Sequence, residues 1–258
     1  MKINAGVGIQ TIPNEQLCIC GSGKIFLNCC KKKNHLYEAI ILPDTGRQII
    51  YDQTEIVVAV QNLHNFIKDR IENIDSKLSL HEAIRKLKRL YEKLDNALAP
   101  MQKVTSCKQG CNHCCHLPIL STQLEIELIK DYMSKHYSPD ELIEFKNKIN
   151  QNKDTFSQLV HTNGRFMDEN YKLYATSNIR CAFLDSNSNC MIYESRPYIC
   201  RKYLVFNEPK VCENTLNKTE QYYSSYHVIV KDAIVKLNKL TYDDHCQYKH
   251  ILSWFAYD

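Results

Sequence analysis

The sequence predicts a mainly α fold with little β structure, in which helices with short connections carry a cysteine-rich domain. Glycine and proline are scarce, with seven residues of each among 258, and this composition disfavours a turn-rich sheet or barrel. Apolar residues recur at intervals of three and four along several segments, which places them on one face of a helix. Hydrophobic residues make up 44% of the chain, enough for one large core or two smaller ones.

Charge and hydropathy limit the classes of function. The formal net charge of +4 is too small to indicate nucleic-acid binding from charge alone. No apolar stretch approaches the roughly 18 residues of a membrane-spanning helix, and residues 1–13 lack the pattern of a secretory signal. We therefore expect a soluble, cytoplasmic protein without a membrane partner. In that compartment the thirteen cysteines stay reduced and are better explained as metal ligands than as disulfides.

The N-terminal motif consists of two cysteine pairs. Eight residues separate Cys18 and Cys20 from Cys29 and Cys30. Four thiolates satisfy one tetrahedral zinc ion, and a segment this short has no core of its own, so the metal must hold it together. The run Cys20-Gly-Ser-Gly-Lys24 and both cysteine pairs resemble the SEC-C motif, a small zinc-binding module. The resemblance implies a structural zinc site and a module that contacts a protein partner.

A short hairpin and a helix follow this motif. Two apolar runs within residues 38–52 flank a turn and predict the hairpin. Asp52 and Glu55 have the spacing of a capping box at the start of a helix. From there an apolar stripe at helical spacing reaches Ile71.

The next helix has clear boundary signals. Ser79 and Glu82 form a second capping box, and an apolar stripe continues to Leu98. Pro100 is expected to end the helix, because proline lacks the N–H group that a helix interior requires. We expect this helix and the preceding one to pack as an antiparallel pair, with the apolar stripes in the core.

The run Cys107–His116 places four cysteines and two histidines in ten residues, a density that no packing or turn requirement explains. It indicates a metal or iron–sulfur ligand loop. Two helices are expected to follow it. One begins at a capping box formed by Thr122 and Glu125 and spans residues 124–136; the other is capped by Ser138 and runs to about residue 160.

A second cysteine-rich region spans residues 181–212. It contains Cys-x-Phe-Leu, Cys-x-Ile-Tyr-Glu, Arg-Pro and Cys-Arg elements, at Cys181, Phe183, Leu184, Cys190, Ile192, Tyr193, Glu194, Arg196, Pro197, Cys200 and Arg201. With the earlier loop that ends in Cys114-Cys115, this pattern resembles the YkgJ family of cysteine-cluster proteins over about residues 105–212. The resemblance implies a zinc- or iron-chelating domain. Three residues separate Cys107 from Cys111, where the family's usual pattern has two.

The candidate metal ligands form three groups of four. They are Cys18, Cys20, Cys29 and Cys30; Cys107, Cys111, Cys114 and Cys115; and Cys181, Cys190, Cys200 and Cys212, while Cys246 belongs to no group. Soft thiolates favour zinc or iron–sulfur clusters over magnesium or calcium. The eight central thiols suit two four-thiolate centres or one cluster with additional thiols. His113 and His116 could complete a site or support it from outside.

Two arginines accompany the second region and are candidate cofactor-binding residues. The guanidinium groups of Arg196 and Arg201 could offset the charge of thiolates or hold an anionic ligand. Alternatively, they pair with Glu194, Asp185 or the carboxyl ends of helices.

Two alternative functions stay open. Flagellin lysine N-methylases carry a related cysteine pattern, and this resemblance implies an S-adenosylmethionine-dependent protein lysine methylase; the sequence has no glycine-rich nucleotide loop that would support it independently. The spacing of Cys107, Cys111 and Cys114 also occurs in radical S-adenosylmethionine enzymes, but the helical pattern that follows disfavours their repeated strand–helix fold. The other alternative is a non-enzymatic recruitment protein whose metal sites are all structural.

These observations predict three domains. Residues 1–35 form the SEC-C-like zinc module, residues 36–100 the hairpin and helical pair, and residues 101–258 the cysteine-cluster domain. The last domain is expected to end with a helix over residues 219–240 and a shorter one that ends at Trp254-Phe255. The leading interpretation is a metal-binding protein that holds zinc or an iron–sulfur cluster.

Overall fold

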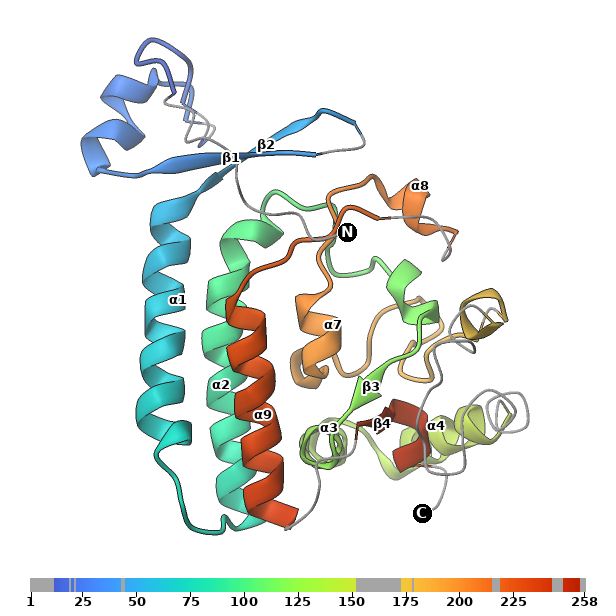
Figure 1. The fold of residues 1–258 in the computed structure, drawn as a ribbon. Helices are drawn as coiled ribbons and strands as arrows, with labels where there is room; N and C mark the ends of the chain where they lie inside the picture. The colour runs from blue at the N-terminus through green and yellow to red at the C-terminus, as the bar shows by residue number, and fades with distance from the viewer. Residues whose placement is uncertain are drawn as a thin grey trace.

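Helices dominate the described part of the chain, and its β structure is limited to two small antiparallel sheets of two strands each (Figure 1). The prediction of a mainly α fold with little β is therefore confirmed. The computed structural model describes residues 12–18, 20, 22–42, 45–151, 173–177, 179–214, 219–242 and 248–255. Within these residues, no helix combines the length and the apolar character that crossing a bilayer requires.

The predicted hairpin is present. Strand β1 (Tyr37–Ile41) pairs with β2 (Gln48–Asp52), and Ala39 lies opposite Ile50. Ala39 and Ile49 are buried. The hairpin lies across the N-terminal end of helix α1, with the cysteine-containing N-terminal segment beyond it (Figure 1).

Helix α1 (Gln53–Ile67) starts where its cap predicts. The Asp52 carboxylate accepts hydrogen bonds from the backbone N–H groups of Thr54 and Glu55. The Glu55 carboxylate does not close a capping box, because it accepts from Lys103 at 2.8 Å. A π-helical turn (Lys68–Glu72) extends the helix and buries Ile71.

Helix α2 (Leu80–Gln102) confirms the Ser79–Glu82 capping box but passes through Pro100. The expectation that Pro100 ends the helix is therefore wrong. The proline costs the helix one hydrogen bond, because its nitrogen has no hydrogen to donate to the Asn96 carbonyl, and its side chain is buried. The Lys103 N–H group still bonds the Ala99 carbonyl and completes the turn.

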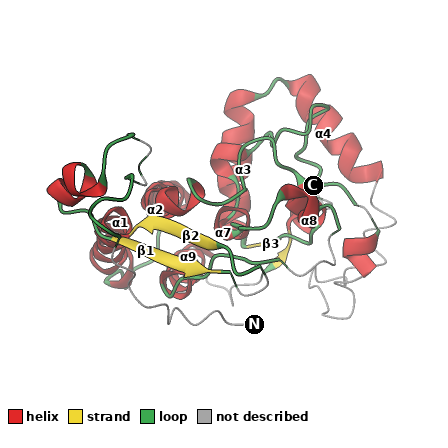
Figure 2. Cartoon of the chain, turned by 90° about the horizontal axis from the view of Figure 1, so that it is seen from above, coloured by secondary structure: helices red, strands yellow, loops and turns green. Residues whose placement is uncertain are grey.

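The first core is a bundle of α1, α2 and α9 (Tyr226–Tyr242), which lie side by side in both views (Figures 1 and 2). Its fully buried residues include Leu63, Leu87, Leu94 and Leu237. Helix α9 belongs to the predicted domain of residues 101–258, but it packs against the helical pair of the predicted domain of residues 36–100. The proposed domain bounds stay a prediction.

Helix α9 begins at Tyr226, and not at Thr219 as predicted. The residues before it pair with an earlier segment instead. The Phe206 N–H group bonds the Glu220 carbonyl at 2.9 Å, and the Tyr222 N–H group bonds the Leu204 carbonyl at 2.9 Å. This extended pairing uses backbone groups that a helix would need for itself.

The second core surrounds α3 (Gln123–His136) and α4 (Pro139–Gln151), on the other side of the molecule from the bundle (Figure 2). The Thr122 capping box is confirmed, and Ser138 caps α4 through Glu141. Strands β3 (Leu120–Ser121) and β4 (Lys249–His250) pair beneath these helices, followed by a 3-10 turn (Ile251–Trp254). Residues 152–160 and Cys246 lie outside the described residues.

Candidate metal centres

The N-terminal cysteines converge. The sulfurs of Cys18, Cys20, Cys29 and Cys30 all lie within 4.8 Å of one another. Cys20 and Cys29 are 3.5 Å apart, and Cys29 and Cys30 are 4.0 Å apart. Tetrahedral zinc with Zn–S bonds of about 2.3 Å separates its sulfurs by about 3.8 Å. The four thiols thus have the spacing that one zinc ion requires.

Local backbone structure brings these pairs together. The Cys18 N–H group bonds the Lys24 carbonyl at 2.7 Å, and a bridge links Leu17 to Ile25. The turn between them contains Gly23 at φ +71°, a conformation that favours glycine. Two 3-10 turns, Phe26–Asn28 and Cys30–Lys33, then present the second cysteine pair.

Hydroxyl groups support the sulfurs of this site. The Tyr37 hydroxyl donates to Cys30 Sγ at 3.0 Å, and the Ser22 hydroxyl lies 3.1 Å from Cys29 Sγ. Hydrogen bonds from Ser22 lower the pKa of the exposed Cys20 to about 6, whereas burial raises the pKa of Cys30 to about 12. Cys20 is therefore ready as a thiolate at neutral pH, and metal binding must displace a proton from Cys30.

The eight central cysteines surround two adjoining cavities. The larger measures about 500 Å³, and its lining includes Cys107, Cys111, Cys114, Cys115, Cys181, Cys190 and Cys200. The smaller measures about 30 Å³, and its lining includes Cys107, Cys111, Cys114 and Cys212. The two cysteine-rich segments, far apart in the sequence, therefore meet around shared space. Their roles as ligands stay a prediction.

The spacing of the central thiols differs from that of the N-terminal ones. Among the described residues, only the N-terminal set brings three or more potential metal-binding atoms within 4.8 Å of one another. The central sulfurs line the walls of a void instead of closing on one point. One metal ion therefore accounts for the arrangement of the N-terminal thiols but not for that of the thiols around the large cavity.

Short elements hold the central cysteines in place. A 3-10 turn (His113–His116) carries Cys114 and Cys115, and the Cys181 N–H group bonds the Cys115 carbonyl at 2.9 Å. Helix α7 (Tyr198–Lys202) carries Cys200, and α8 (Pro209–Cys212) ends at Cys212. This hydrogen bond and the one from the Val205 N–H group to Cys107 Sγ, at 3.3 Å, join the two cysteine-rich segments directly.

A buried carboxylate fastens the second segment to the helices. Glu125 is 2% exposed. Its Oε2 closes the capping box with Thr122, and its Oε1 accepts from the Tyr91 hydroxyl at 2.6 Å and from the Tyr198 N–H group at 2.8 Å. Sequence reasoning assigned Glu125 only to the cap. No local pattern signals its second role, because both of those partners come from distant elements.

Arg201 is held by structural contacts. Its guanidinium group pairs with Asp95, donates to the carbonyls of Arg196 and Glu194, and lies 4.3 Å from the centre of the Tyr91 ring. The side chain is 3% exposed and also lines the large cavity. The arginine is thus paired with a carboxylate, as the alternative predicted, but the partner is Asp95, and Glu194 contributes its carbonyl. A contact of Arg201 with a cofactor stays a prediction.

Of the two arginines, Arg196 has the contacts that better fit the predicted role of holding an anion. It lines the large cavity and stacks over Tyr193 at 3.9 Å, and its buried Nε has no hydrogen-bond partner. Burial raises the pKa of Cys190 and of Cys200, and the positive charge of Arg196 opposes this rise. Arg196 therefore favours the thiolate form that a metal needs.

Burial, and after it the charges of neighbouring cysteines, raises the pKa of other thiols of the large cavity and keeps them protonated while no metal is bound. It raises the pKa of Cys181 to about 12 and that of Cys107 to about 11. Metal loading must therefore release protons, and the metal affinity depends on pH.

Of the two histidines in the first loop, His113 lines the small cavity.

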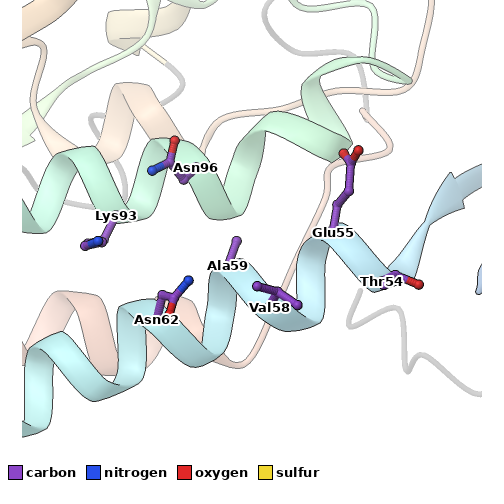
Figure 3. Close-up of a pocket in the computed structure, with 7 residues that line it drawn as sticks. All are labelled: Thr54, Glu55, Val58, Ala59, Asn62, Lys93 and Asn96. Atoms are coloured by element: carbon purple, nitrogen blue, oxygen red, sulfur yellow. The ribbon is translucent and has the colours of Figure 1, made fainter. Parts of the chain in front are cut away.

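A third cavity, of about 370 Å³, lies between α1 and α2 (Figure 3). Asn62 of α1 and Lys93 and Asn96 of α2 face it, with Glu55 at one end. Its lining contains no cysteine or histidine. It therefore offers no donor set for zinc or iron.

Comparison with known proteins supports the chemistry of the central site. Residues 106–224 match the family model described as "CxxCxxCC: Putative zinc- or iron-chelating domain". Neither a curated protein nor a solved structure matches the chain. The matched segment contains all eight central cysteines, and the N-terminal four lie outside it. Together, this match and the converging N-terminal thiols support metal binding through clustered cysteines.

Proposed function

We propose that the protein holds two kinds of metal centre: a structural zinc ion at the N-terminal cysteines and an iron–sulfur cluster in the large central cavity. The contrast in thiol spacing, together with the volume of about 500 Å³ that the spaced thiols enclose, carries this proposal. In one and the same structure, four thiols converge to the separation of a zinc site, while the thiols around the large cavity stay apart. A cluster of several metal ions holds its thiolates farther apart than a single ion does, because each thiolate binds a different iron.

The residues present in the large cavity fit such a group. Cysteine thiolates are the usual ligands of iron–sulfur clusters, and the wall includes the apolar side chains of Phe183, Ile192 and Ile251, all buried. This wall would exclude water. Arg196 supplies positive charge beside Cys190 and Cys200, which would offset the negative charge of a thiolate-bound cluster. The cluster, when bound, would supply redox or Lewis-acid chemistry.

The N-terminal site fits a structural ion. Four cysteines fill the tetrahedral coordination of zinc and leave no open position for a substrate. The small core around Phe26, Cys18 and Cys30 is itself made largely of ligands, so folding of this module and zinc binding would be one process. These properties agree with the SEC-C-like assignment.

A protein partner is the proposed ligand of this N-terminal module. Leu17, Leu27 and Leu36, on or next to it, are 66%, 40% and 65% exposed. Protein interfaces are marked by exposed apolar side chains that gather in one patch, and we place these three leucines in such a patch. Leu17→Ser should weaken capture of that partner while the module keeps its zinc, and capture that stays unchanged would contradict the assignment.

Anaerobic purification with metal analysis tests the choice of metals. The full chain should contain iron and acid-labile sulfide, with broad visible absorption from thiolate-to-iron transitions, as well as zinc. Cys18→Ser should remove the zinc ion of the N-terminal site and leave the visible spectrum intact, whereas Cys190→Ser should abolish the spectrum. If zinc is the sole metal after anaerobic work and no visible absorption develops, the iron–sulfur assignment is wrong.

A further inference from the structure

The eight central cysteines divide unequally between the two cavities. Cys212 lines only the small one. Four others line only the large one: Cys115, Cys181, Cys190 and Cys200. The remaining three, Cys107, Cys111 and Cys114, line both. If these three join Cys212, each cavity receives four thiols and no cysteine is left over.

The sizes of the two cavities suit different contents. The small cavity measures about 30 Å³, room for one or two bodies the size of a water molecule. It can hold one ion but no cluster. The large cavity, at about 500 Å³, has more than ten times that space.

Several contacts direct Cys107 toward the small cavity. Its sulfur accepts a hydrogen bond from the Val205 N–H group at 3.3 Å, and the preceding Ser106 N–H group bonds the Val205 carbonyl at 3.0 Å. The segment that leads to Cys212 is thus paired with the start of the first ligand loop. A backbone N–H group that donates to sulfur is a typical support for a metal thiolate.

The extra residue between Cys107 and Cys111 belongs to the same arrangement. Gly110 adopts φ +89°, a conformation that side chains disfavour, and the Cys111 N–H group closes a turn onto the Lys108 carbonyl at 3.0 Å. This turn returns Cys111 toward Cys107. Helix α8, which carries Cys212, packs against the 3-10 turn that carries Cys114. Cys114 and Cys212 therefore line the small cavity from two elements that are in contact.

We propose that the small cavity is a separate centre that binds one zinc ion through Cys107, Cys111, Cys114 and Cys212. The proposal rests on the proposed function in one respect, because it leaves Cys115, Cys181, Cys190 and Cys200 as the ligands of the large cavity. No three of the central sulfurs lie within 4.8 Å of one another, so zinc binding draws Cys107, Cys111 and Cys114 together within the first ligand loop and draws α8 toward them. The four thiols lose their protons to solvent as the Zn–S bonds form.

Metal counts on single-cysteine variants test this division. The anaerobically purified full chain should contain two zinc ions, one at each four-thiol zinc site, together with iron. Cys212→Ser should lose one zinc ion and keep its iron and visible spectrum. Cys190→Ser should lose the iron and keep both zinc ions. Cys246→Ser, which removes a cysteine outside all three ligand groups, is the matched control and should change neither count.

A further variant separates a ligand from a merely structural thiol. Cys212→His should recover the zinc ion that Cys212→Ser loses, because imidazole nitrogen also binds zinc. Zinc should also slow proteolysis near α8 in the wild type and in Cys212→His, but not in Cys212→Ser. Circular dichroism verifies that each variant is folded.

The outcomes distinguish the two proposals. If Cys212→Ser keeps both zinc ions, or loses zinc and iron together, the separate centre is refuted and the iron–sulfur assignment stands on its own spectrum. If the wild type contains no iron, but Cys212→Ser and Cys190→Ser each lose one different zinc ion, the separate centre is supported and the iron–sulfur assignment fails.

Discussion

Replacing Glu125 with glutamine tests whether its buried carboxylate fastens the second ligand segment to the helices. The carboxylate accepts four hydrogen bonds, from the Tyr91 hydroxyl, the Tyr198 N–H group, and the N–H and hydroxyl groups of Thr122. Glutamine keeps one oxygen and places an NH₂ group where the other oxygen was. A hydroxyl group can rotate and accept a hydrogen bond from this NH₂ group, whereas a backbone N–H group can only donate. The variant therefore either strands the buried Thr122 N–H group or leaves the Tyr198 N–H group with only its longer bond to the Tyr91 hydroxyl, at 3.1 Å.

The size of the destabilisation follows from the hydrogen bonds that the variant loses. A hydrogen bond to a charged group contributes about 1.5–3 kcal/mol, and a stranded buried donor costs about 1–3 kcal/mol. We expect Glu125→Gln to lower the free energy of unfolding by about 3 kcal/mol. The matched control is Glu92→Gln, because Glu92 is 56% exposed in its ion pair with Arg89. Exposed pairs of this kind contribute less than about 1 kcal/mol.

Urea unfolding of the metal-loaded protein measures both variants. Circular dichroism and the fluorescence of the single tryptophan, Trp254, follow the transition, and an unchanged urea dependence shows that the same surface is exposed on unfolding. Iron content reports whether the ligand segment is still in place. A cost for Glu125→Gln that equals that of Glu92→Gln would refute the reasoning.

Two further predictions concern the N-terminal site and pH. Tyr37→Phe removes the hydroxyl that donates to Cys30 at 3.0 Å, and we expect about tenfold weaker zinc retention in competition with a chelator; equal retention would show that this hydrogen bond does not tune the metal. Burial, with the nearby charge of Lys202, lowers the pKa of His227 to about 4, below the value of about 6.5 in an unfolded chain. The unfolded state therefore binds a proton first, and stability is lost as pH falls from about 6.5 to 4. His227→Phe should lose less stability than the wild type over this window in urea titrations at each pH, and parallel profiles would assign the pH dependence to other groups.

Local sequence determined the elements whose signals lie within a few residues. The capping boxes at Ser79 and Thr122 marked the starts of α2 and α3 correctly, because a cap is formed by side chains three residues apart. The convergence of the N-terminal cysteines followed in the same way from spacing. Their motif is short enough for two tight turns to bring its ends together.

Tertiary structure decided the features that depend on distant partners. Helix α9 starts at Tyr226 because residues before it pair with 204–206, and α2 continues through Pro100, which is buried in the bundle core.

The same dependence governs the central site. The sequence identifies all eight central cysteines as candidate ligands. Which of the two cavities each thiol lines depends on the position of the backbone around Val205. Spacing along a chain cannot supply that information, since the two ligand segments are joined by contacts between residues about one hundred positions apart. The sequence thus determined which donors are present, and only the fold decided which of them can share a metal.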